Sequence, residues 1–256
     1  MSVVQLECLI DGQNVSTTQL EKVQYDLHLH MLREMKKLGA TLRHDGKSLS
    51  DDDIGRLTLE EARDVSIATR KSLGVEGLKE LFRDELLATD QMWKDANDVP
   101  EGAPSLYAQT DVKVTGVTLE EVGKVINLNA IHEVYAQMHP DHCFAKGDGK
   151  LLEHMEVFGH FGGPTWLYAH PSETISVPVE RDEAYPMVMA GSTTLASDGT
   201  PMNLFAYHQF KPLDDGFAIK QCAIFPPGTP QDIVEGHKLH LAIEIWEGAK
   251  LAAAQR

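Results

Sequence analysis

The end of the chain is its most constraining stretch. Residues 233–254 read IVEGHKLHLAIEIWEGAKLAAA, which predicts one long helix whose middle is apolar except for His240 and Glu244. A spacing of four places these two side chains one turn apart on the same helix face. A carboxylate in such an apolar run is costly unless a positive partner meets it. A divalent metal ion shared with His240 is one such partner. The alternative is a solvated polar stripe with an ordinary His–Glu contact.

Composition narrows the class of protein. The 256 residues allow one large domain, or one domain plus a smaller helical piece. A formal charge of −16 argues against nucleic acid or an anionic membrane surface as a partner. No apolar run approaches the roughly 18–20 residues that span a bilayer, and the start lacks the positive region of a signal peptide. Cys8, Cys143 and Cys222 lie far apart and fit reduced thiols. We therefore expect a cytoplasmic protein.

Residues 1–105 are predicted to form a helical N-terminal module. Capping-box patterns open helices over about residues 18–38 and 58–72, and a third helical periodicity covers about residues 76–95. A stretch rich in Pro, Gly and Asp, residues 97–105, ends the module as a linker. Its histidines have no acidic or cysteine partner at ligand spacing. We expect surface positions for His28, His30 and His44.

Residues 106–256 form the second predicted domain. It begins with a helix over residues 122–138 that carries His132, and from about Leu151 the pattern alternates as in strands. The last helix is expected to start after a proline-rich stop, with Thr229 as its cap. An antiparallel meander followed by a long helix predicts an α+β, helix-grip fold (START-like, birch-allergen-like) with a cavity between sheet and helix. Besides the strand beginning near residue 151, strands are predicted at residues 165–170, 174–179, 185–196, 202–210 and 217–225.

Two polar residues on these strands are candidates for the same cavity. Glu156 and His208 each share a strand face with apolar residues, so we expect both to point towards the His240 side of the last helix. His132 would approach from the connection before the sheet. Two imidazoles and two carboxylates suit zinc or another divalent ion. The alternatives are a solvated strand face for Glu156 and a hydrogen-bonded core histidine for His208. The histidines that could replace His132 as a ligand are His139, His142, His154 and His160.

Several segments together carry a resemblance to a known family. They are Thr115–Thr118, Tyr135–His142, Glu156 shortly before Gly162 and Gly163, Tyr207–His208 followed by Asp214–Gly216, and His240–Glu244. In order and approximate spacing they resemble the phloretin hydrolase and diacetylphloroglucinol hydrolase family of zinc-dependent carbon–carbon hydrolases. The resemblance covers roughly residues 112–256.

The resemblance implies both a site and a reaction. It implies a zinc ion held by His132, Glu156, His240 and Glu244, with His208 contacting the phenolic oxygen of a substrate. The implied reaction is retro-Claisen hydrolysis of a carbon–carbon bond next to a ketone. The substrate would be an acylphenol, a polyketide-like aromatic or a β-diketone, and Glu244 would also move protons.

Two other classes of function stay open. One is a metal-free helix-grip protein that binds a small apolar ligand, in which the buried carboxylates would need protons or basic partners. The other is a different polyketide-processing metalloenzyme, such as a cyclase or a dehydratase. In each case the helical module would cover the cavity or form a homodimer, and a homodimer is our expectation.

Overall fold

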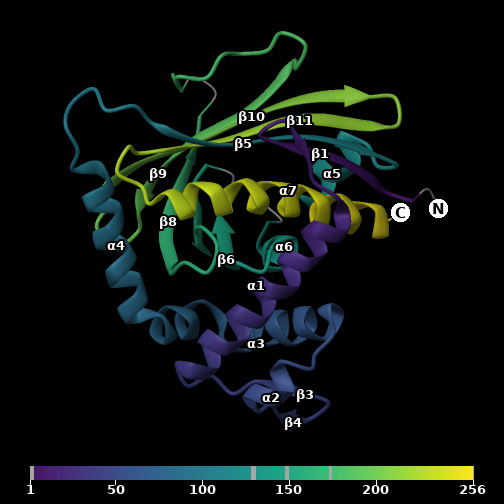
Figure 1. Cartoon of the computed structure of the whole chain (residues 1–256), viewed down its shortest axis with the longest axis vertical. Coiled ribbons are helices and arrows are strands. Elements are labelled where there is room, and N and C mark those ends of the chain that lie inside the picture. The colour runs from purple at the N-terminus through teal and green to yellow at the C-terminus, as the bar shows by residue number, and fades with distance from the viewer. Residues whose placement is uncertain (1–2, 128–130, 148–149, 173–174, 256) are drawn as a thin grey trace.

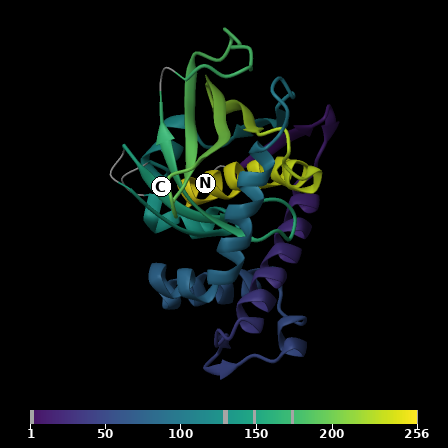
Figure 2. The same ribbon diagram turned by 90° about the vertical axis from the view of Figure 1, so that its left-hand side faces the viewer.

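The computed structural model describes residues 3–127, 131–147, 150–172 and 175–255. The chain is α+β. A large antiparallel sheet is crossed by the C-terminal helix, and a group of helices from the first part of the chain projects to one side (Figures 1 and 2). Among the helices that the structure describes, none is both long enough and apolar enough to pass through a bilayer.

Within the described residues, the main sheet has nine strands in the order β2-β1-β5-β11-β10-β9-β8-β7-β6, and all neighbours are antiparallel. The turn at residues 213–216 joins β10 to β11. Four of these strands, β1, β2, β5 and β6, were not predicted, because they border segments with stronger helix signals. The strands are β1 (Gln5–Ile10), β2 (Gln13–Asn14), β5 (Leu106–Thr115), β6 (His142–Gly147), β7 (Leu152–Val157), β8 (Pro164–Pro171), β9 (Met187–Leu195), β10 (Pro201–Leu213) and β11 (Gly216–Phe225).

The helices of the first module lie close to where they were predicted. Ser16 and Thr58 cap α1 and α3 by accepting hydrogen bonds from backbone N–H groups, and Gly74 (φ 64°) interrupts α3. Two details differ. Strand β1 belongs to the main sheet, and His28, expected at the surface, is only 3% exposed. The elements are α1 (Thr17–Lys37), β3 (Arg43–His44), β4 (Lys47–Ser48), α2 (Asp51–Ile54), α3 (Leu59–Leu81) and α4 (Arg83–Asn97).

Three further expectations for the second half are corrected. The helix predicted over residues 122–138 is two helices, α5 (Leu119–Val125) and α6 (Ile131–Met138). Of the strand predicted at residues 174–179, position 174 lies outside the described residues, and the described residues 175–179 form no strand. Helix α7 (Gln231–Ala254) follows Pro230 without a side-chain cap, because the Thr229 hydroxyl donates to the Pro226 carbonyl oxygen instead.

Helix α7 is held close to the sheet at two points. Gly236 packs directly on the backbone after β7, where a Cβ atom would lie 2.4 Å from the His160 nitrogen and 2.7 Å from the Gly159 carbonyl carbon. The Thr110 hydroxyl on β5 donates to the Lys238 carbonyl oxygen at 2.9 Å. These contacts fix the height and rotation of the next helical turn, which carries His240.

Candidate metal centre

The loop between α6 and β6 carries the polar His-Pro-Asp-His segment, and Arg70 of α3 holds it in place. The Arg70 guanidinium is buried and donates to the carbonyl oxygens of Ala136 (3.2 Å) and Pro140 (3.0 Å), and also to that of His142. Carbonyl oxygens at both ends of the loop therefore point at one rigid, planar donor. This arrangement sets the position at which the His142 side chain enters the core.

His142 directs one ring nitrogen towards two other side chains that can bind a metal ion. Its Nδ1 lies 2.9 Å from the Tyr135 carbonyl oxygen, which selects the tautomer with a proton on Nδ1 and a free lone pair on Nε2. That Nε2 atom is 3.0 Å from His240 Nε2 and 3.7 Å from a Glu156 carboxylate oxygen. The Tyr135 ring stacks on His142, and its hydroxyl donates to Glu156. Tyr135 therefore orients two of the three converging side chains.

Burial controls the protonation of this group. It lowers the pKa of His142 and of His240 well below the usual histidine value, so both rings are neutral at pH 7. It raises the pKa of Glu156 to about 7, and the hydrogen bond from Tyr135 opposes that rise. Neutral imidazoles and a carboxylate that is costly to leave unpaired are a donor set for a divalent cation.

The same three side chains pass a geometric test for a metal. Donor atoms of His142, Glu156 and His240 all lie within 4.8 Å of one another. His240 Nδ1 is buried and has no hydrogen-bond partner among the described residues. We conclude that these buried residues fit a divalent ion, and they leave the identity of the metal open.

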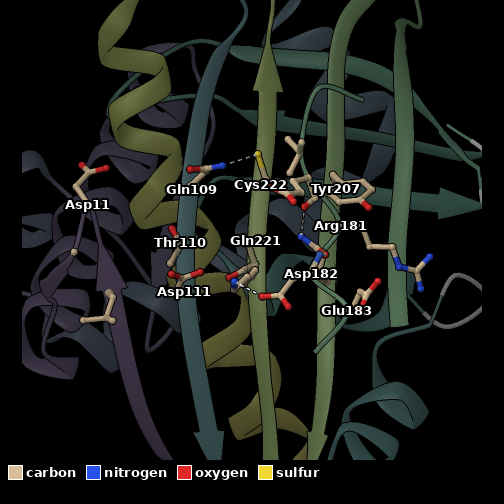
Figure 3. A pocket seen from close by; sticks show the side chains of 16 residues that line it. Asp11, Gln109, Thr110, Asp111, Arg181, Asp182, Glu183, Tyr207, Gln221 and Cys222 are labelled. Atoms are coloured by element: carbon tan, nitrogen blue, oxygen red, sulfur yellow. Dashed lines mark hydrogen bonds and ion pairs between the residues drawn. The ribbon is translucent and has the colours of Figure 1, made fainter. Parts of the chain in front are cut away.

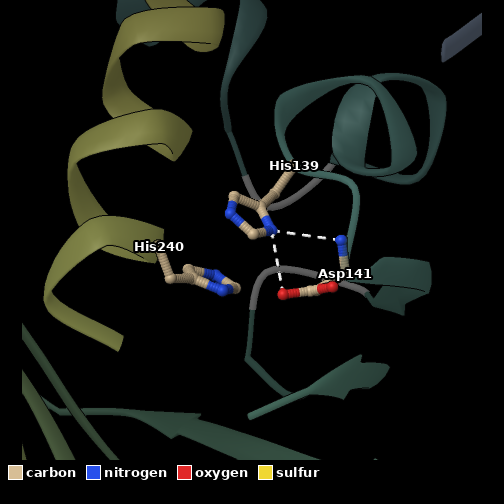
Figure 4. Close-up of side chains that lie close together, drawn as sticks. All are labelled: His139, Asp141 and His240. Atoms are coloured by element: carbon tan, nitrogen blue, oxygen red, sulfur yellow. Dashed lines mark hydrogen bonds and ion pairs between the residues drawn. The ribbon is translucent and has the colours of Figure 1, made fainter. Parts of the chain in front are cut away.

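A second group, His139, Asp141 and His240, also brings donor atoms within 4.8 Å (Figure 4). His139 stacks on His240, with ring centroids 3.9 Å apart. However, His139 Nδ1 already accepts a hydrogen bond from the Asp141 backbone N–H at 3.1 Å, so its lone pair is in use. Burial also raises the pKa of Asp141 well above its usual value, which favours the neutral acid. The group containing His142 is therefore the better metal site.

A cavity of about 130 Å³ adjoins this site between α7 and the sheet. His208 faces it from β10, and Glu244 faces it from α7, one turn after His240. Burial, with Glu156 nearby, raises the pKa of Glu244 to about 8. The Cys222 backbone N–H donates to His208 Nδ1 at 3.3 Å, which leaves the His208 proton on Nε2. The apolar side chains that line the cavity are those of Phe158, Leu167, Ala169, Leu204, Phe205, Ala206, Ala223 and Leu241.

A larger pocket of about 760 Å³ lies away from these residues, beneath the segment 179–183 (Figure 3). Some of its polar groups form ion pairs or hydrogen bonds with one another. Lys220 pairs with Asp182 at 2.5 Å, and the Gln109 amide donates to the Cys222 sulfur at 3.8 Å. The converging imidazole and carboxylate groups belong to the smaller cavity, so we place the candidate site there.

Four of the five residues singled out from the sequence come together in the structure. Glu156, His208, His240 and Glu244 all line the small cavity. His132 does not join them: its side chain is 56% exposed and lies 3.8 Å from Glu133. The physical reason is the rotation of α6, which buries Ile131, Val134, Tyr135 and Met138 and turns position 132 outwards.

His142 occupies the position expected for His132. Of the remaining candidate histidines, His154 lines the cavity, His139 is buried beside His240, and His160 is exposed. The dense His-Pro-Asp-His segment was the sequence signal for His142. No sequence signal indicated Arg70, because a single arginine on an amphipathic helix is usually solvated.

Comparisons with known proteins do not extend the assignment: no family model matches the chain, and no curated protein matches it.

Proposed function

We propose that the chain is a metal-dependent hydrolase that cleaves a carbon–carbon bond next to a ketone in an acylphenol, a polyketide-like aromatic or a β-diketone. The observation that carries the proposal is the convergence of His142, Glu156 and His240 at the wall of an apolar cavity. The helix-grip arrangement belongs to this proposal, and its support is a cavity lined by both the sheet and α7. The resemblance of residues 112–256 to zinc-dependent carbon–carbon hydrolases supports the same interpretation.

His142, Glu156 and His240 would hold the cation in this proposal. A zinc ion or another divalent cation, when bound there, polarises a carbonyl group and lowers the pKa of water. Tyr135 keeps two of these ligands oriented through its carbonyl oxygen and its hydroxyl. The apolar lining excludes bulk water from the rest of the cavity and favours an uncharged substrate.

His208 would act as a neutral hydrogen-bond donor. Burial lowers its pKa to about 4, so the ring carries a single proton at pH 7, and that proton is on Nε2. A donor of this kind binds a ketone or phenolic oxygen and stabilises negative charge as it develops there. A cationic histidine would bind that oxygen more strongly but would be costly to bury here.

Glu244 is our candidate for proton transfer. Hydrolysis adds the hydroxyl of water to the carbonyl carbon, breaks the carbon–carbon bond and returns one proton to the departing carbon. A carboxyl group whose pKa is about 8 can take up that proton and release it near neutral pH. Glu244 lies one turn from His240 on the same helix and lines the same cavity.

Metal content and activity of matched variants test this proposal. We expect the purified protein to contain a divalent metal that is lost in His142→Ala and His240→Ala. The control, His132→Ala, should retain it because His132 is exposed. Glu244→Gln should keep the metal but hydrolyse acylphenols and β-diketones at least ~100-fold more slowly. Full metal retention in a His142→Ala/His240→Ala double variant would contradict the site.

One observation favours a second candidate, a metal-free protein that binds a small apolar ligand. The pKa values of Glu156 and Glu244 are raised by burial to about 7 and about 8, so both groups can remain uncharged without a cation near neutral pH. Such a protein would show the same thermal stability with and without added zinc. It would also bind ketones without consuming them.

A further inference from the structure

Two exposed methionines lie on the same sheet face as residues that line the cavity. Met187 and Met189 of β9 are 50% and 53% exposed. Met189 is the cross-strand partner of His208, and Met187 is the partner of Phe210. Because cross-strand partners lie on the same face of a sheet, both methionines lie on the face that carries His208.

The same face continues without a break from the cavity to the methionines. Thr193 of β9 lines the cavity, and alternate residues along a strand share a face, so Thr193, Gly191, Met189 and Met187 follow one another on that face. Gly191 contributes no side chain between Thr193 and Met189. A ligand seated beside His208 would therefore meet Met189 as the next side chain on β9.

The opposite face of β9 is covered. Val188 and Ala190 pack with Val177, Val179 and Tyr207 in an apolar cluster beneath the segment that precedes the strand. The chain thus shields the apolar residues of β9 on the face away from the cavity, while the methionines on the cavity face stay exposed. Unbranched methionine side chains adapt to ligands of different shape.

The small size of the cavity explains why a substrate would need such a surface. A cavity of about 150 Å³ in a protein core accommodates benzene, so one of about 130 Å³ holds little more than a single ring or a short diketone. Any larger substrate must leave part of itself outside. On this face of β9, Met189 lies directly across the strand pair from His208.

We propose that Met187 and Met189 form an apolar rim that binds the non-reacting tail of the substrate, which is an uncharged ketone with a compact head and an apolar aryl or alkyl tail. This proposal deepens the proposed hydrolase function and rests on it, because the bound ketone is a substrate only if the protein hydrolyses it. The contact itself is a binding property of the rim and can be measured without turnover.

The test compares two β-diketones that share a reacting head and differ in the tail. Acetylacetone and benzoylacetone are titrated calorimetrically into the metal-loaded Glu244→Gln protein, in which turnover is slow, and into the same protein carrying Met187→Gln/Met189→Gln or, as a control, Leu87→Gln. Leu87 is 64% exposed on α4 and does not line the cavity. We expect the double variant to bind benzoylacetone about tenfold more weakly and acetylacetone as before, since only the longer tail reaches the methionines. The control should change neither affinity.

Several results would contradict the proposal that Met187 and Met189 bind the substrate tail. These are an unchanged benzoylacetone affinity, an equal loss for both diketones, or no binding of benzoylacetone to the parent protein. A dimer that dissociates in the double variant with ketone affinity unchanged would instead make this surface an interface between two copies of the chain. Methionine-dependent binding of benzoylacetone without hydrolysis of either diketone would keep the rim and refute the hydrolase.

Discussion

At the scale of single residues, Tyr135 links the two kinds of ligand in the candidate centre. Its hydroxyl donates to Glu156, and its carbonyl oxygen accepts from His142. Tyr135→Phe removes only the first contact. Because that hydrogen bond opposes the rise in the pKa of Glu156, the pKa should rise further and metal affinity should fall by about 10–100-fold. Competition with a chelator measures the change.

A matched tyrosine controls for the general cost of removing a buried hydroxyl. Tyr25 donates to the Leu57 carbonyl oxygen at 2.8 Å and is not part of the metal site. Tyr25→Phe should reduce stability by about 0.5–1.5 kcal/mol and leave metal affinity unchanged. Equal metal affinity in the parent and in a well-folded Tyr135→Phe would show that the hydroxyl does not support the ligand.

At the scale of elements, the crossing of α7 over the end of β7 depends on Gly236. A Cβ atom at this position would clash with backbone atoms of His160 and Gly159, which cannot rotate away. We expect Gly236→Ala to lower the free energy of unfolding by about 1–3 kcal/mol and to weaken metal binding, because the helix must lift His240 away from its partners. Chemical denaturation measures the first effect and chelator competition the second.

Gly123 of α5 provides the matched control, since a Cβ atom there would meet nothing within 4 Å. Gly123→Ala should raise the free energy of unfolding by about 0.5–1 kcal/mol, because alanine favours the helix. If both alanine variants were stabilised alike, the close crossing of α7 would be refuted.

Also at the scale of elements, the sequence predicted those features of the fold that leave a periodic pattern of apolar residues. It located α7, the strands from β7 to β11 and the inward faces of Glu156 and His208, because alternation and helical spacing report burial directly. It did not locate the rotation of α6, which decides between His132 and His142. That rotation is set by packing against distant elements, as is the position of Arg70 beneath the histidine loop.

At the scale of the whole molecule, the first helices complete the candidate site. Arg70 of α3 holds the loop that carries His142, although it precedes that loop by many residues. Helices α1 and α3 also attach to the far part of α7, where Gln24 and Arg63 contact the buried Glu247 at 2.9 Å and 3.0 Å. The helical module is therefore part of the framework that positions the donors on both the loop and α7.

Because the whole framework surrounds two buried carboxyl groups, metal binding and pH should act together on global stability. In the metal-free protein the folded state keeps protons on Glu156 up to a pKa of about 7 and on Glu244 up to about 8, whereas the unfolded chain has released both above pH ~4.5. The two carboxyl groups thus hold more protons in the folded state, so the stability that they contribute falls as pH rises from ~4.5 to about 8. The neutral buried histidines do not oppose this trend above pH ~7, since they are largely uncharged in both states.

A bound divalent cation should reverse the trend by stabilising the ionised carboxylates. We therefore expect the gain in melting temperature on adding zinc to the stripped protein to grow between about pH 6.5 and about pH 8. Glu156→Gln should flatten this dependence, because an amide does not titrate, whereas Glu133→Gln, at an exposed position, should leave it unchanged. Calorimetric melting across this pH range measures the effect. A zinc-induced gain that shrinks with rising pH would be incompatible with raised pKa values at the site, because protons compete with the cation only below those values.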